Sequence, residues 1–237
     1  MELLGEVVAW FLDPAHWTGT AGIPNRLIEH LRLSVVSVVV GSAIAIPIGL
    51  LIGHTGRGAL LAVGVANLGR AVPSYALLLI FFPIFGFGEA TAFPALVLLA
   101  IPPILVNTYT GLRGVDADLV EAGRGMGMTE LQLLARVELP AAATVIVAGL
   151  RVAAVAVVAT ATLAALVAGG GLGRFIADGF GLREQDQLLA GAILVALLAI
   201  VVDRGFTLLE RRLLLPNDRR VPGPTDLAQP PPGVLPA

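Results

Sequence analysis

Cysteine and lysine are both absent from this chain of 237 residues. Without cysteine the chain has no thiol nucleophile, no disulfide and no thiolate ligand for an iron–sulfur cluster. Because all 15 basic residues are arginine, it also lacks the lysine of a phosphate-binding loop or of a Schiff base. We therefore expect no cofactor in this chain, and if ATP drives the protein, another chain must bind it.

Charged residues are scarce, at 14% of the chain, whereas hydrophobic residues make up 57%. A soluble domain carries about 25% charged residues, so this composition indicates a protein whose solvent is lipid. The net charge of −2 provides no basic face, which excludes nucleic acid as a partner. The three histidines lie far apart without metal-ligand spacing and are interpreted as loop or interface residues, so no metal is assigned.

Five long apolar segments follow one another along the chain. A bilayer core of about 30 Å needs roughly 20 apolar residues per helix, and backbone groups in lipid must find their hydrogen-bond partners within the helix. We therefore predict an all-α, multi-pass bundle of about five transmembrane helices in the cell (inner or plasma) membrane. The predicted crossings are residues 33–52, 59–85, 92–109, 141–168 and 188–209.

The arginines between these crossings indicate the orientation, because positively charged loops stay in the cytoplasm. One side carries the larger share, namely Arg57, Arg113, Arg124, Arg136, Arg204, Arg211, Arg212, Arg219 and Arg220. The other side carries Arg26, Arg32, Arg174 and Arg183. This distribution predicts an outside N-terminus, an inside C-terminus and a cytoplasmic segment at residues 111–140.

The two ends of the chain are expected to lie outside the membrane-spanning domain, which covers residues 27–212. Within residues 1–26, apolar side chains recur at helical spacing from Leu3 to Phe11, which suits a short helix in the membrane interface. A frayed terminus is the alternative. Residues 213–237 are rich in proline and poor in apolar residues, so a disordered cytoplasmic tail is predicted.

The cytoplasmic segment 111–140 carries local signals for two short helices joined at a sharp turn. Gly125 and Gly127 give the chain freedom to turn between them. Each helix has a capping-box pattern at its start: Asp118 with Glu121, and Thr129 with Gln132.

Both of these short helices are amphipathic. Their apolar faces are predicted to be Leu119, Gly123 and Met126 in the first, and Leu131, Leu134 and Ala135 in the second. Such a face must be covered either by the rest of this chain, as in an ordinary loop, or by a partner. The pattern alone leaves both interpretations open.

The same segment resembles the EAA loop of bacterial ABC importer permeases. The matching residues are Glu121, Ala122 and Gly123, then Gly127, Val137, Leu139 and Pro140 at the spacing of that family. Gly123 stands where alanine is usual and Val137 where isoleucine is usual. The resemblance implies that the loop docks in a groove of an ATPase subunit, which binds ATP and Mg, through residues around Gly127, Met128 and Thr129.

The resemblance extends over residues 27–212 and is closest to the osmoprotectant branch of that family. The stretches that carry it are residues 70–74, 103–111, 148–151 and 169–173. It implies a type I importer permease (MetI-like) fold and transport of glycine betaine, choline, carnitine or proline betaine. It also implies three partners: the ATPase, a second permease subunit, identical or paralogous, and an extracytoplasmic substrate-binding protein.

Two other functions remain as alternatives. A permease of the same family could carry methionine or another amino acid, since the glycine stretch also resembles methionine-type permeases. A stand-alone channel or secondary transporter would work without ATP and would need no docking surface. A membrane enzyme is less favoured, because the sequence shows no nucleophile–base pair and no cluster of metal ligands.

Two arginines are predicted inside the membrane. Arg70 and Arg151 each lie about eleven residues, or roughly 16 Å, from the cytoplasmic start of their helices, where an arginine costs about 2.5–3.5 kcal/mol. No acidic residue is expected at that depth. The expected partners are therefore backbone carbonyls near Pro73, water, a neighbouring subunit or a substrate carboxylate. One hypothesis is that one of the two arginines lines the path and senses the carboxylate of a zwitterionic substrate, and the favoured alternative is structural bracing of a broken helix.

Two sets of residues are candidates for the route of the solute. The candidate translocation path comprises Arg70, Pro73, Ser74, Tyr75, Asn107 and Arg151. The glycine-rich stretch after the fourth crossing is either a helix C-cap with its loop or part of an external gate. Its candidate residues are Gly169, Gly170, Gly171 and Gly173.

Overall fold

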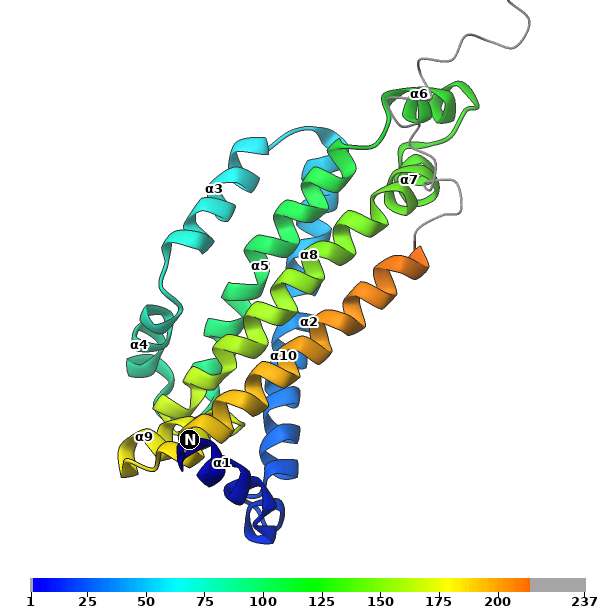
Figure 1. The fold of residues 1–237 in the computed structure, drawn as a ribbon. Helices are drawn as coiled ribbons and strands as arrows, with labels where there is room; N and C mark the ends of the chain where they lie inside the picture. The colour runs from blue at the N-terminus through cyan, green and yellow to red at the C-terminus, as the bar shows by residue number, and fades with distance from the viewer. Residues whose placement is uncertain (1, 214–237) are drawn as a thin grey trace, which may run out of the picture.

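The computed structural model describes residues 2–213 and shows a bundle of helices running between two ends of the molecule (Figure 1). Within α3 only the backbone is described for some residues, Arg70 among them. The predicted proline-rich tail, apart from its first residue, lies outside the described residues. No strand occurs among the described residues, in agreement with the all-α prediction.

Four helical stretches are long and apolar enough to cross a membrane. Three are the single helices α2 (Ile23–Thr55), α5 (Glu89–Arg113) and α10 (Gln185–Leu213). The fourth runs without interruption from Glu130 to Val167. It comprises α7 (Glu130–Leu133), a π-helical segment (Leu134–Glu138), α8 (Leu139–Thr160) and a 3₁₀ segment (Ala161–Val167).

The remaining predicted crossing, residues 59–85, consists of two helices. These are α3 (Ala59–Ala71) and α4 (Ser74–Phe85), with Pro73 as the N-cap of α4. The residue before a proline disfavours the helical region of backbone space, which explains the break at Val72. Figure 1 shows α4 following α3 along one side of the bundle. Neither is among the four stretches long enough to cross a membrane, so a fifth crossing stays a prediction.

Helices α2 and α5 lie against one another because small residues let their backbones approach. A Cβ atom added to Gly49 would lie 2.7 Å from Cβ of Thr108, and one added to Gly53 would lie 2.8 Å from Cβ of Leu112. This pairing fixes the C-terminal end of α2 beside the C-terminal end of α5, where the EAA loop (residues 111–140) begins.

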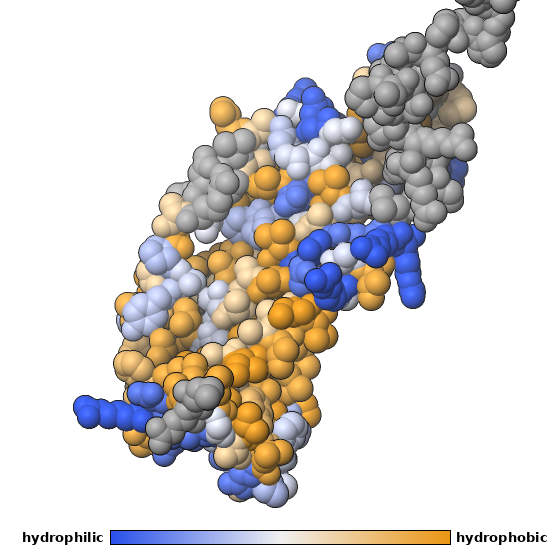
Figure 2. Space-filling model, in the orientation of Figure 1, coloured by the Kyte–Doolittle hydropathy of each residue, from blue (hydrophilic) through white to orange (hydrophobic). Residues whose placement is uncertain are grey.

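The surface has the distribution expected of a membrane protein. Figure 2 shows apolar side chains across the middle of the molecule and hydrophilic ones toward its two ends and along the C-terminal part of α10. Exposed apolar side chains on α2 include Val35, Val39, Ile48 and Leu51. A surface of this kind is stable in lipid.

The N-terminal segment forms a helix, α1 (Glu2–Leu12), which packs against α10. Trp10 is buried, and its ring meets that of Phe175 edge to face at 5.3 Å. The alternative of a frayed terminus is therefore wrong, whereas contact with the membrane interface stays a prediction. Phe175 belongs to α9 (Gly173–Leu182). The sequence pattern did not predict this helix, because 10 residues are too few for a long apolar run.

Candidate coupling and translocation site

The EAA loop forms two helices at one end of the molecule, α6 (Ala117–Gly125) and α7 (Figure 1). The predicted capping box at the start of the second helix is confirmed, because Thr129 and Gln132 form reciprocal hydrogen bonds there. The predicted N-cap of the first helix, Asp118, is wrong by two residues. Asp116 is the N-cap of α6, and its Oδ1 accepts a hydrogen bond of 3.0 Å from the backbone N–H of Asp118. Asp118 already has a helical backbone and cannot fill the capping position.

The turn between the two helices has the predicted glycine. Gly127 has φ +78°, a left-handed conformation that glycine adopts at little cost. Pro140 is the second residue of α8, directly after the π-helical segment from which α8 continues without interruption.

This chain covers the predicted apolar faces of the loop only in part. Gly123 is buried against Leu133, and Leu133 itself is fully buried. Leu131, on the predicted apolar face of the second helix, is 75% exposed. Helix α7 continues into a π-helical segment, whose wider turn changes which residues share a face.

An apolar surface therefore remains exposed at the tip of the loop. Leu119, Met126 and Leu131 are exposed by 53%, 71% and 75%, and we call these three residues the loop-tip surface. Most of the predicted coupling residues are exposed as well. Glu121, Ala122, Gly127, Thr129, Leu139 and Pro140 are exposed, Met128 is half-buried and Gly123 is buried. Exposed apolar patches of this kind mark sites of protein interaction.

At the base of the loop lies a polar cluster that the sequence did not reveal. Nδ1 of His54, in the last turn of α2, lies 2.6 Å from Oε2 of Glu138. Nε2 of the same ring lies 3.2 Å from Oε2 of Glu130. Arg124 of α6 also contacts Glu130, at 3.4 Å. A pocket of about 250 Å³ between the ends of α2 and α5 and helix α6 adjoins this cluster.

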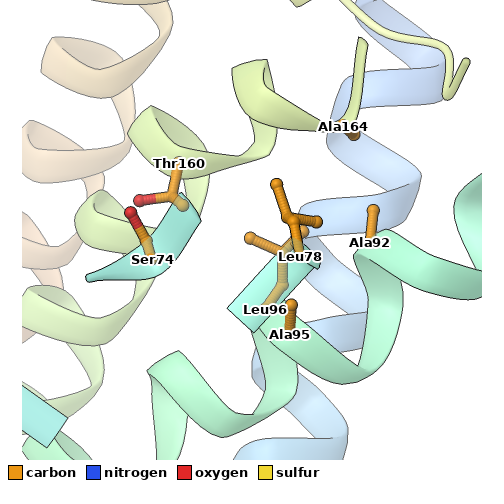
Figure 3. A pocket seen from close by; sticks show the side chains of 7 residues that line it. All are labelled: Ser74, Leu78, Ala92, Ala95, Leu96, Thr160 and Ala164. Carbon is orange, nitrogen blue, oxygen red and sulfur yellow. The ribbon is translucent and has the colours of Figure 1, made fainter. Parts of the chain in front are cut away.

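Among the candidate path residues, Ser74 lies at an enclosed hollow of about 10 Å³. It is the first residue of α4, and Figure 3 shows its hydroxyl turned toward that of Thr160, at the end of α8. The other lining residues are apolar, namely Leu78, Ala92, Ala95, Leu96 and Ala164. Tyr75, the next residue along α4, is half exposed.

Asn107 lies at a different hollow. It lines a groove of about 340 Å³ that α3, α5 and α8 border, together with Gly69 and Val152. Its Nδ2 donates a hydrogen bond of 2.8 Å to the carbonyl of Pro103. The candidate path residues are thus not gathered around one chamber within the described residues of this chain.

The expectation that Arg151 has no acidic neighbour is wrong. Its Nε donates a hydrogen bond of 2.7 Å to Oδ1 of Asp203, and its Nη1 lies 3.3 Å from Oε2 of Glu210. The two acidic residues are seven positions apart and therefore share one face of α10. Figure 1 shows α10 running beside α8, and the two helices are in contact. Arg70 lies in the last turn of α3, and its side chain is not among those described.

The glycine-rich stretch is a packed connection between the 3₁₀ segment and α9. Gly169, Gly171 and Gly173 are buried, and Gly170 is half-buried. The N–H of Gly171, which has φ +91°, donates a hydrogen bond of 2.8 Å to Oε2 of Glu29 in α2. Ala168 adopts the left-handed conformation that ends the preceding helix. A gating role for this stretch stays a prediction.

Solved structures of importer permeases have the same fold. An inward-facing structure of the MetNI methionine ABC transporter matches with a TM-score of 0.71 at 23% identity, over 81% of this chain and 96% of that chain. An amino acid ABC transporter solved with histidines matches with a TM-score of 0.65 at 20% identity, over 80% and 93%. The described residues therefore have the MetI-like fold.

Comparison of sequences then identifies the family. Residues 45–215 match the family described as binding-protein-dependent transport system inner membrane component, and the chain belongs to that family. It is 45% identical to the carnitine transport permease protein OpuCB of Listeria monocytogenes, over 87% of this chain and 93% of the relative. It is 40% identical to the choline transport system permease protein OpuBB of Bacillus subtilis, over 78% and 85%. It is also 38% identical to the osmoprotectant import permease protein OsmW of Salmonella typhimurium, over 84% and 92%.

Proposed function

We propose that this permease carries an osmoprotectant into the cell, with glycine betaine, choline, carnitine or proline betaine as the solute. The observation that carries the proposal is the 45% identity to a carnitine permease over nearly the whole chain. Choline, carnitine and glycine betaine appear in the names of further relatives. All of these solutes have a quaternary ammonium group, which makes them one chemical class. The methionine transporter shares the fold at only 23% identity, so its solute is not favoured.

The energy for transport comes from a separate ATPase subunit, which binds ATP and Mg. Two features of the loop support this assignment. The EAA loop has the spacing of a coupling loop, and the loop-tip surface offers exposed apolar side chains beside Gly127, Met128 and Thr129. In such an importer the nucleotide-driven closure of two ATPase subunits shifts the permease between inward-open and outward-open states.

A second permease subunit, identical or paralogous, completes the route of the solute. Two of the candidate path residues, Ser74 and Asn107, line separate hollows in the described part of this chain, and the groove beside Asn107 is open to the surface. A facing subunit would convert such a groove into an enclosed passage. An extracytoplasmic binding protein delivers the solute, in accordance with the family to which the chain belongs.

Reconstitution tests this function directly. The permease is placed in liposomes with its ATPase subunit and its binding protein, and uptake of labelled glycine betaine, choline, carnitine and methionine is measured with and without ATP. We expect ATP-dependent uptake of at least one quaternary ammonium solute and little uptake of methionine. Uptake of methionine alone would contradict the proposed solute. Uptake without ATP would contradict the proposed mechanism.

A further inference from the structure

His54 connects the end of a membrane-spanning helix to the EAA loop. It lies in the last turn of α2, 84 residues before its partner Glu138. Its two ring nitrogens face two carboxylates, at 2.6 Å from Glu138 and 3.2 Å from Glu130. Glu138 lies in the π-helical segment and Glu130 at the start of α7. One side chain of α2 thus contacts both ends of the second loop helix.

Burial makes the contact with Glu138 energetically important. Only 6% of Glu138 is exposed, and a buried carboxylate is costly unless it is hydrogen-bonded or paired. Its side-chain partner among the described residues is His54. Removal of the imidazole would therefore leave this carboxylate buried without that partner.

The link between α2 and the loop has a polar part and an apolar part. Leu50 of α2 packs in an apolar cluster that includes Val115 and Leu134 of the loop. On the other side of the helix end, a pocket of about 250 Å³ separates α6 from the ends of α2 and α5, and His54 and Glu138 line it. The polar cluster is therefore a hydrogen-bonded contact from α2 to the loop, beside the apolar packing and the helices α5 and α8 that continue from the loop.

We propose that His54 is a positioning residue for coupling: through Glu138 and Glu130 it makes α2 follow the EAA loop when the loop moves. This inference rests on the proposed function, because it requires an ATPase subunit that moves the loop. The π-helical segment supports it, since widened turns of this kind are frequent at functional sites. Loss of the hydrogen-bonded contact loosens the loop from α2, so ATP is hydrolysed with less solute transported.

The test is the number of solute molecules transported for each ATP hydrolysed by the complete reconstituted transporter. We expect His54→Ala to lower this ratio about fivefold or more, the size of a typical coupling between sites, while the ATPase subunit still copurifies. His54→Gln, whose amide can still donate to Glu138, should restore most of the ratio. In the double variant His54→Ala with Glu138→Ala the losses should not add, since the two residues act as one unit.

Thr55→Ala is the matched control, because Thr55 is exposed at the same helix end and its hydroxyl bonds to nearby backbone: it donates to the carbonyl of Leu51 and accepts from the N–H of Arg57. It should leave the ratio unchanged. An unchanged ratio in His54→Ala would overturn the inference, as would loss of assembly in every His54 and Glu138 variant, because the pair would then serve folding alone. Failure of the unaltered permease to bind or stimulate an ATPase subunit would instead overturn the proposed function.

Discussion

Arg151 of α8 and Asp203 of α10 are joined by a hydrogen bond of 2.7 Å between Nε and Oδ1. Glu210 adds a second carboxylate to the same guanidinium at 3.3 Å. An arginine placed within a membrane-spanning helix is thereby neutralised inside its own chain. The pair explains how α10, whose surface is largely exposed, is held against α8, and it favours bracing over recognition of substrate as the role of Arg151.

The first prediction concerns this pair. Arg151→Gln should lower the thermal unfolding midpoint and the amount of folded protein, because Asp203 and Glu210 lose their shared cation. The KM for uptake of a zwitterionic solute should stay unchanged. Arg204→Gln removes the same charge from an exposed position of α10 and should change little. A raised KM for betaine with unaltered stability would instead indicate that Arg151 recognises the substrate.

The second prediction concerns the contact between α2 and α5. Gly49→Ala places a methyl group 2.7 Å from Cβ of Thr108, so the helices must separate, at a cost of about 1–3 kcal/mol. Gly205→Ala is the control, because a Cβ atom there meets nothing within 4 Å. Alanine favours a helix over glycine by about 1 kcal/mol, so the control should be neutral or stabilising in thermal unfolding in detergent. Equal effects of the two substitutions would argue against the close approach of α2 and α5.

The third prediction tests the loop-tip surface. Met126→Asp and Leu131→Asp place a charge on side chains that are already exposed, so the fold should be kept. Binding of the ATPase subunit should weaken about tenfold or more, as for apolar residues at the centre of an interface. Copurification and titration of the ATPase subunit measure this. Leu182→Asp, equally exposed in α9 at the other end of the molecule, should have no effect; if it weakens binding as much, the loss is not specific to the loop.

The fourth prediction distinguishes the two aspartates at the start of α6. Asp116→Ala removes the N-cap hydrogen bond to the N–H of Asp118 and should destabilise the helix by about 1 kcal/mol. Asp118→Ala removes only a first-turn charge, which contributes less. Amide hydrogen exchange of α6 should therefore accelerate more in Asp116→Ala than in Asp118→Ala. The opposite order would indicate that Asp118 is the N-cap of α6.

Features that depend on nearby residues were predictable from the sequence. The capping box of Thr129 and Gln132 needs residues only three positions apart, and it was confirmed. The break before Pro73 follows from the stereochemistry of one residue pair. Helix α9 and the cap at Asp116 were missed because short amphipathic helices give weak signals and their boundaries shift by one or two residues.

The sequence by itself determined that the chain is a bundle of membrane-spanning helices with an EAA loop at one end, because long apolar runs and motif spacing are properties of consecutive residues. Only the tertiary structure decided which distant side chains meet. The pairs Arg151 with Asp203 and His54 with Glu138 lie 52 and 84 residues apart. The angle and register at which helices cross bring them together, and these depend on packing along whole helices rather than on any local pattern.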